Sequence, residues 1–157
     1  MTTDDLRWLR DRIEIQELLA RYCDRLDAHD LDAVAATFTE DARSNYGPGR
    51  GGDVVGRAAI RDRIARGQSV FRRTHHQVGH STITIDGDTA TGTAAVLTWH
   101  ERFNGVRELL ALRYVDGYRR VDDTWLISFR RVDVSVVEGF DGTEWNWWQR
   151  RSPEYPA

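Results

Sequence analysis

The feature that most constrains the fold of this chain is a change in the spacing of its apolar residues near His75. Before that point, apolar side chains recur three and four residues apart, which is the period of a helix buried along one face. The clearest stripe of this kind consists of Ile15, Leu18, Leu19, Tyr22, Cys23 and Leu26. This stripe predicts a core-facing helix of about six turns, with Asp4 or Asp5 as its N-cap.

Two further helices are predicted before His75. Asp30 is a suitable N-cap for the second, whose apolar positions are Leu31, Val34, Ala35 and Phe38. A glycine-rich break at residues 47–52 separates it from a third helix, at about residues 56–66. The first half of the chain is therefore expected to be helical.

After His75 the chain is rich in Val, Ile, Thr and aromatic residues, and three turn signals divide it into four strand-like segments. These signals are Asp86-Gly87-Asp88, Asn104-Gly105 and Asp122-Asp123. Asn-Gly is favoured in two-residue type I′ hairpin turns, because both central residues adopt positive φ there. The second half is therefore predicted to be an antiparallel meander. Helices followed by a run of strands indicate an α+β domain, with helices packed on one face of a curved sheet.

Length and composition fit one folded domain spanning residues 1–157. Hydrophobic residues make up 40% and charged residues 30% of the chain, which is ordinary for a globular protein. The net charge of -3 comes from interspersed acidic and basic residues, whereas nucleic-acid binding needs a clustered basic surface. Cys23 is the single cysteine, and no apolar run is long enough to span a membrane, so a cytoplasmic protein is expected.

The C-terminal segment, residues 139–157, is unusually aromatic for a polar stretch interrupted by prolines. Its large side chains are Trp145, Trp147, Trp148 and Tyr155. Such rings are expected to cover apolar surface, either at a subunit interface or sheet edge, or as a lid over a pocket.

Asp27 is the first residue that suggests chemistry. It lies four residues after Cys23 and eight after Leu19, so the helix that buries those residues also tends to bury the carboxylate. The alternative is an exposed position at the helix end. A buried carboxylate needs a hydrogen-bonding or charged partner, and a histidine is a natural one.

Histidines gather where the strands are predicted to begin. His75, His76 and His80 lie within six residues, and His100 lies on the next segment. Alternate residues of a strand share a face, so a regular strand points His76 and His80 to one side and His75 to the other. His76 and His80 would then be about 13 Å apart along the strand, so no metal site is predicted.

The register of this strand leaves the choice of histidine open. If an unbroken strand directs Ile83 and Ile85 toward the core, His75 shares their face and His76 does not. A single β-bulge would reverse this. We favour His76, with His75 as the alternative.

Four motifs together resemble the scytalone dehydratase-like branch of the SnoaL-like superfamily. Residues 24–32 resemble the end of its first helix, and Tyr46 follows Asp27 at the spacing of its catalytic tyrosine. Residues 76–81 and 99–103 resemble the strands that hold its two catalytic histidines. The matches run in family order over about residues 13–138. The resemblance implies a cone-shaped fold of the nuclear transport factor 2-like type, with an internal pocket.

The resemblance also implies roles for individual residues. Asp27 would orient His76, Tyr46 would donate a hydrogen bond, and His100 would support them. The further pocket residues expected to contact substrate are Tyr22, His75, His80, Trp99, Leu112, Tyr114 and Arg131. The family's second water-holding tyrosine corresponds to Leu26, and its small polar pocket residues fall on Leu112 and Tyr114. A substrate other than scytalone is therefore expected.

Taken together, these features predict a cofactor-independent lyase, a dehydratase that acts on a small cyclic or aromatic hydroxy-carbonyl compound. No cofactor is expected, because the glycines of residues 47–52 have neither the preceding strand nor the spacing of a dinucleotide-binding loop. The alternatives are an isomerase or cyclase, a carbon-carbon or carbon-halogen lyase, and a non-catalytic binder of small hydrophobic or aromatic molecules. Family relatives are usually trimers, so a homotrimer is expected before a homodimer.

Overall fold

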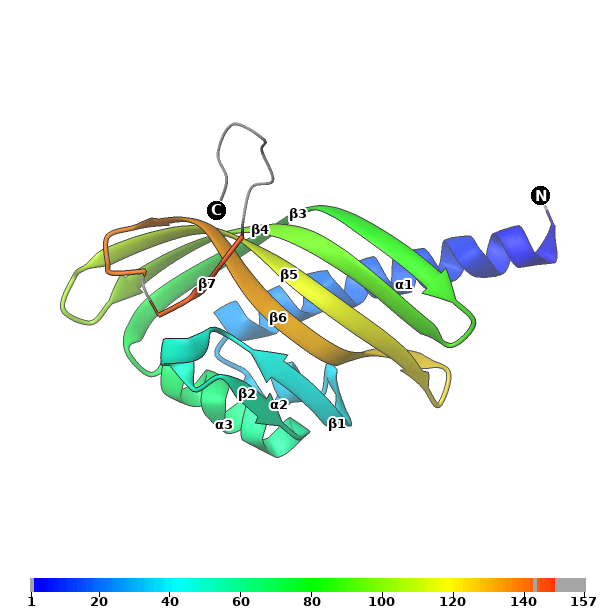
Figure 1. Ribbon diagram of the computed structural model, residues 1–157, viewed down its shortest axis with the longest axis horizontal. Coiled ribbons are helices and arrows are strands. Elements are labelled where there is room, and N and C mark those ends of the chain that lie inside the picture. Colours follow the sequence, from blue (N-terminus) through cyan, green and yellow to red (C-terminus); the bar gives the residue numbers. More distant parts are fainter. Residues whose placement is uncertain (1, 143, 149–157) are drawn as a thin grey trace.

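The computed structural model describes residues 2–142 and 144–148, which form helices packed on one large, curved sheet (Figure 1). The elements in chain order are α1 (Thr3–Asp27), α2 (Leu31–Ala35), β1 (Phe38–Asn45), the short 3₁₀ helix η1 (Pro48–Arg50), β2 (Asp53–Val55), α3 (Arg57–Gln68), β3 (Phe71–Asp86), β4 (Thr89–Arg102), β5 (Arg107–Val121), β6 (Thr124–Glu138) and β7 (Asn146–Trp147). The three predicted helices and the four predicted long strands are thus present, and the α+β class is confirmed. The second helix is shorter than predicted, because Phe38 lies in β1.

The sheet is mixed rather than wholly antiparallel. Its strand order is β2-β1-β6-β5-β4-β3, and β7 pairs with β6 outside that path. Strands β3 to β6 form the predicted antiparallel meander, but β1 and β7 each run parallel to β6. Strands β1 and β2 were not predicted. The reason is that Glu40, Asp41 and Arg43 place charges along β1, while Phe38 and Ala42 supply the few buried apolar side chains.

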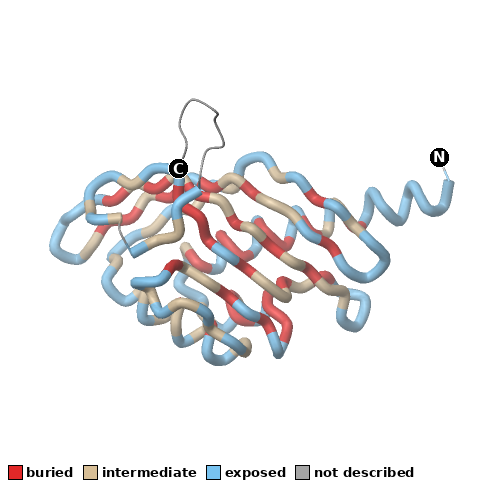
Figure 2. The backbone as a smooth tube through the Cα atoms, viewed as in Figure 1, coloured by how far each residue is buried: buried red, intermediate tan, exposed pale blue. Residues whose placement is uncertain are grey.

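Helix α1 lies across the sheet and contacts β3 and β6 (Figure 1). The predicted apolar stripe from Ile15 to Leu26 is buried in the core, whereas the first turns of α1 extend beyond the sheet and are exposed (Figure 2). Thr2 is the N-cap, in a capping box with Asp5, so the prediction of Asp4 or Asp5 was wrong by a few residues. Among the described residues, no helix has the length and apolarity needed to cross a membrane.

The hairpin turns differ from the predicted types. Asp122 and Asp123 both have positive φ, of 47° and 60°, and form the tight two-residue turn between β5 and β6. At Asn104-Gly105 only the glycine has positive φ, of 84°, and β4 and β5 are joined by a four-residue loop instead. In that loop the Asn104 side chain accepts a hydrogen bond from the Val106 amide, which stabilises the wider turn.

Candidate active site

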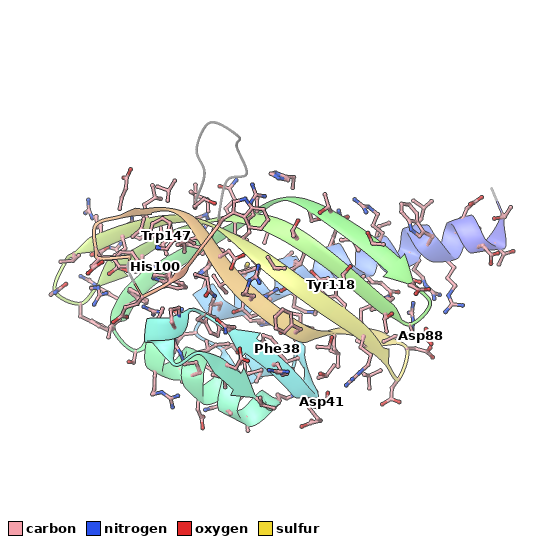
Figure 3. All side chains as sticks on the ribbon, in the orientation of Figure 1. Phe38, Asp41, Asp88, His100, Tyr118 and Trp147 are labelled. Carbon is pink, nitrogen blue, oxygen red and sulfur yellow. The ribbon has the colours of Figure 1, made fainter. Side chains whose placement is uncertain are left out.

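A cavity of about 110 Å³ lies between the sheet, the C-terminal end of α1, helix α3 and the segment after β6. Figure 3 shows His100 near one end of the sheet and Asp88 near the other. The cavity is at the His100 end and is lined by Tyr22, Leu26, Tyr46, Arg50, Arg63, Ile64, Gly67, Gln68, Val70, Phe71, His76, Thr98, His100, Arg102, Glu108, Leu110, Leu112, Tyr114, Val132, Phe140 and Trp145. Its wall is therefore mostly apolar, with a few ionisable groups, as is typical of small-molecule sites.

Asp27 and His76 form a hydrogen-bonded pair in which His76 lines the cavity and Asp27 lies behind it, outside the lining. The Asp27 Oδ1 atom lies 2.6 Å from His76 Nδ1, and the Asp27 Oδ2 atom accepts a bond of 2.8 Å from the His76 backbone amide. Thr74 Oγ1 donates a third bond, of 2.8 Å, to Oδ1. Because an ionised carboxylate only accepts, Asp27 selects the tautomer of His76 that carries its proton on Nδ1. The lone pair of His76 Nε2 then faces the cavity, with His100 Nε2 3.5 Å away as its neighbour.

The surroundings keep Asp27 ionised and His76 neutral. Burial opposes ionisation of Asp27, but the hydrogen bonds from His76 and Thr74 outweigh it and lower the pKa of the carboxyl group. The His76 side chain is only 4% exposed. Burial lowers the pKa of His76 below its ordinary value, although the Asp27 carboxylate acts in the opposite direction. His76 is therefore an uncharged base near neutral pH.

His100 lies directly beside His76 on the cavity wall. Their Nε2 atoms are 3.5 Å apart, and the Phe71 ring packs on His100 with a centroid distance of 4.4 Å. On its other side, His100 Nδ1 lies 3.9 Å from Glu108 Oε2, and Glu108 is also bound by Arg102. Burial opposes ionisation of Glu108, but His100 and Arg102 hold its pKa below the usual value. The two imidazoles thus lie between two carboxylates.

Glu108 and Arg102 were not predicted as site residues. In the β4–β5 hairpin His100 pairs directly with Glu108. The predicted two-residue turn at Asn104-Gly105 would instead have paired His100 with Leu109, so the longer loop of the structure is what brings Glu108 opposite His100.

Three buried phenols line the cavity beside the histidines. These are Tyr22, Tyr46 and Tyr114, and burial raises the pKa of each, so all three remain protonated hydrogen-bond donors. The Tyr46 hydroxyl is buried and has no partner at hydrogen-bonding geometry among the described residues, although the nearby Tyr22 and Ser44 hydroxyls partly offset the rise in its pKa. A ligand can therefore compete for this hydroxyl.

A buried ion pair supports the phenols from within the core. Arg130 donates two hydrogen bonds, of 2.8 and 2.6 Å, to Asp116, and both side chains are fully buried. The guanidinium lies 4.3 Å from the ring centroid of Tyr22 and 3.8 Å from that of Tyr114. Its charge partly opposes the effect of burial on the phenol pKa values. Arg130 was not singled out from the sequence, because a fully buried arginine cannot be recognised without its partner.

A β-bulge settles which histidine faces the cavity. The pairing of β3 with β4 advances three residues on β3, from Val78 to Ser81, but only two on β4, from Val96 to Ala94. The extra residue lets His76 point into the cavity while Ile83, farther along β3, is still buried in the core. The sequence-based preference for His76 over His75 as the inward residue therefore agrees with the geometry.

The other predicted site residues divide into two groups. Tyr22, Leu112 and Tyr114 line the cavity together with Tyr46, His76 and His100. Four do not line it, namely His75, His80, Trp99 and Arg131. Strand alternation turns His75 and its β4 partner Trp99 to the opposite face, and the bulge leaves His80 exposed. Arg131 is half-exposed and forms an ion pair with Asp133. These four residues, which were expected to contact substrate, therefore lie outside the lining of this cavity.

The segment after β6 contributes one tryptophan to the cavity. Trp145 is a lining residue, and the Arg50 guanidinium lies 4.2 Å from its ring centroid. The backbone of this segment passes so close to Gly47 that a Cβ atom there would collide with it. The glycine-rich loop thus provides a surface on which the segment packs. Trp147 and Trp148 are half-exposed, and Tyr155 lies outside the described residues.

No group of three His, Cys, Asp or Glu side chains suited to hold a metal ion occurs within residues 2–142 and 144–148. The polar groups of the cavity are instead suited to proton transfer and hydrogen bonding. A neutral imidazole held by a carboxylate is a general base, and an unpartnered phenol can stabilise a developing oxyanion.

Comparison with known proteins identifies relatives along most of the chain. The family model for the SnoaL-like domain matches residues 7–131. The uncharacterized protein Rv2910c of Mycobacterium tuberculosis is 32% identical over 135 residues, which cover 83% of this chain and 88% of that protein.

Two solved structures show the same fold at lower identity. A candidate scytalone dehydratase from Novosphingobium aromaticivorans superposes with a TM-score of 0.86 at 22% identity. The superposition covers 96% of this chain and 100% of that protein. A hexachlorocyclohexane dehydrochlorinase, LinA type 2, has a TM-score of 0.79 at 19% identity, covering 96% and 99%. These likenesses confirm the cone-shaped α+β fold that the sequence resemblance implied.

Proposed function

Because the chain belongs to the SnoaL-like domain family, we propose that it is a cofactor-independent lyase that eliminates water from a small cyclic or aromatic hydroxy-carbonyl compound. The observation that carries this proposal is the Asp27–His76 pair, in which a buried neutral imidazole is held with one nitrogen toward the cavity. The unpartnered Tyr46 hydroxyl lines the same cavity. A base and an oxyanion donor on one small cavity are the groups that elimination next to a carbonyl requires.

In the first step His76 Nε2 removes the proton from the carbon next to the substrate carbonyl. The electron pair of the broken C–H bond moves to the carbonyl oxygen and forms an enolate. Tyr46 donates a hydrogen bond to that oxygen, and Tyr22 can donate a second. Asp27 stabilises the imidazolium that forms, because its negative charge lies 2.6 Å from His76 Nδ1.

In the second step the enolate re-forms the carbonyl and expels the hydroxyl group, which leaves as water after taking up a proton. The donor is His76, which carries the proton removed in the first step, or His100, which then takes up the proton of His76 across the 3.5 Å between their Nε2 atoms. One C–H and one C–O bond break, and one C=C and one O–H bond form, so by either route the protein returns to its starting state without an oxidant or reductant.

The comparisons support elimination as the reaction class. The two similar structures are a candidate scytalone dehydratase and a dehydrochlorinase, and both names denote removal of hydrogen together with a leaving group. Leu112 and Tyr114 line this cavity at positions where the family resemblance implies small polar residues, which favours a substrate other than scytalone. The cavity of about 110 Å³ is smaller than the roughly 150 Å³ that accepts benzene, so it favours a compact substrate, and an aromatic ring enters it only if lining side chains such as that of Trp145 move outward.

The proposal can be tested with a panel of small β-hydroxy ketones and aldehydes, cyclic and aromatic. Elimination is followed by the ultraviolet absorbance of the conjugated product, and deuterium exchange next to the carbonyl is followed by NMR. Wild-type protein and His80→Ala should convert the same compounds, because His80 is exposed outside the cavity. His76→Ala should lose about a hundredfold or more of the rate.

Other outcomes would assign a different function. Exchange without release of water would indicate an isomerase that uses the same base and phenol. Binding of compounds with neither exchange nor elimination, unchanged in His76→Ala, would contradict catalysis and indicate a ligand carrier.

A further inference from the structure

The cavity contains more positive than negative charge, and the proposed elimination does not use the excess. Three arginines line it, Arg50 from η1, Arg63 from α3 and Arg102 from β4, against one glutamate, Glu108. Arg102 is bound to Glu108 and is thereby neutralised. The two remaining arginines lie toward the α3 side of the cavity.

Arg63 forms no ion pair with any carboxylate among the described residues. Its Nε atom donates a hydrogen bond of 2.8 Å to the backbone carbonyl of Arg50, which fixes the direction of the side chain. The guanidinium lies 5.1 Å from the ring centroid of Tyr46. A fixed, unpaired guanidinium thus borders the phenol that we assign to the enolate oxygen.

Arg50 is only weakly compensated. Its partner is Glu144, at 3.8 Å, whose side chain is 59% exposed and therefore well screened by water. The Nε atom of Arg50 is buried and has no hydrogen-bond partner among the described residues. Burial, and then repulsion from Arg63, lower the pKa of Arg50. An anion bound between these side chains would remove that repulsion.

We propose that Arg63 and Arg50 form a carboxylate-binding subsite, so that the ligand of this cavity is a compact organic acid. Within the proposed function, on which this assignment of substrate class rests, the substrate is a hydroxy-carbonyl compound that also carries a carboxylate. A planar guanidinium matches a carboxylate through paired hydrogen bonds. The acid group would lie at Arg63, with the carbonyl oxygen beside Tyr46 and the reacting carbon toward His76.

The subsite can be tested by calorimetric titration with benzoate and its uncharged isostere, benzamide. Wild-type protein should bind benzoate about tenfold or more tightly, because charge-assisted hydrogen bonds stabilise only the anion. Added salt should weaken binding of benzoate more than that of benzamide. No preference for benzoate in the wild type would overturn the proposal, and so would tighter binding of phenyl phosphate than of benzoate.

Variants locate the preference within the cavity. Arg63→Gln should lose most of the preference for benzoate but still bind benzamide, and Arg63→Lys should keep part of it. Arg66→Gln is the matched control, because Arg66 is an exposed arginine in the last turn of the same helix. Equal effects of Arg63→Gln and Arg66→Gln on benzoate binding would overturn the assignment to Arg63. If Arg63→Gln does not fold, the wild-type titrations still test the preference for benzoate, and Arg63→Lys still tests its assignment to Arg63.

The proposed elimination and the proposed carboxylate subsite can be refuted independently of each other. His76→Ala should retain the preference for benzoate, because binding of the anion does not use the base. A wild type that prefers benzoate but eliminates no water from carboxylated substrates would contradict the lyase proposal and leave the subsite intact. Turnover of neutral substrates without a preference for benzoate would support the lyase proposal and contradict the carboxylate subsite.

Discussion

Replacing Asp27 with asparagine should switch the tautomer of His76 while leaving the fold intact. The carboxylate accepts three hydrogen bonds, from His76 Nδ1, the His76 amide and Thr74. In Asp27→Asn the amide oxygen can take the place of Oδ2 and accept from the His76 backbone. The amide nitrogen then faces His76 Nδ1 and donates to it. The His76 proton is thereby displaced to Nε2, the atom that must act as the base.

The structure sets the size of this effect. All three contacts can persist as neutral hydrogen bonds, so the main loss is charge assistance, which makes such bonds roughly twice as strong. Because Asp27 is 22% exposed, we expect the free energy of unfolding to fall by only about 1 to 2 kcal/mol. The rate should fall by about 10² to 10⁴, as expected when a general base is held in its wrong tautomer.

Nitrogen-15 NMR of the histidine rings can detect the tautomer without any substrate. Wild-type His76 should show a protonated Nδ1 and an unprotonated Nε2, and Asp27→Asn should show the reverse. Since Asp27 raises the pKa of His76, its removal should also move the titration of His76 to lower pH. Urea denaturation of both proteins measures the stability change. An unchanged tautomer in a folded variant would refute the role given to Asp27, and a fully unfolded variant would show that the contact is chiefly structural.

Four further predictions follow from the site and its surroundings. Tyr46→Phe should lower the rate by about tenfold to a hundredfold, less than loss of His76, because Tyr22 remains as a second donor; an unchanged rate would exclude Tyr46. The free energy of unfolding should decline as the pH falls below 6.5, because burial lowers the pKa of His76 in the folded protein and the unfolded chain takes up the proton first. Urea denaturation at several pH values should show a smaller decline for His76→Gln than for the wild type. Ending the chain after Gly139 should weaken benzoate binding in calorimetry, because Trp145 is lost from the cavity wall. Unaltered binding would argue against a lid. Loss of the circular dichroism signal would indicate that the segment is structural. We also propose a homo-oligomer, a trimer before a dimer, because the large apolar residues Leu97, Val136 and Trp148 are exposed. Light scattering that reports a stable monomer at micromolar concentration would contradict this.

Local patterns predicted the elements whose partners lie close along the chain. The apolar stripe of α1 placed Asp27 on the buried side, and the turn signals separated β3, β4, β5 and β6 correctly. These features depend on helical period, strand alternation and turn chemistry, all of which can be read within a few residues.

Features that depend on distant partners were missed. Strand β1 is charged along much of its length and becomes a strand by pairing with β6, more than eighty residues later. Arg130 is buried because Asp116 neutralises it, and Arg63 enters the cavity because α3 packs beside η1 and β1. Each outcome is set by tertiary contacts that override local preference.

The bulge between Val78 and Ser81 reverses the side-chain alternation of β3. Before the bulge the even-numbered His76 faces the cavity, and after it the odd-numbered Ile83 faces the core. A regular strand with the same number of residues would bring either His75 to the cavity or Ile83 outward, whereas a chain one residue shorter here, lacking Gly79 for example, would keep His76 and Ile83 on one face without a bulge. The number of residues in this short stretch therefore matters as much as their identity. Aligning the chain with a relative that has a gap nearby requires the gap to be placed within the bulge, or the wrong histidine is matched.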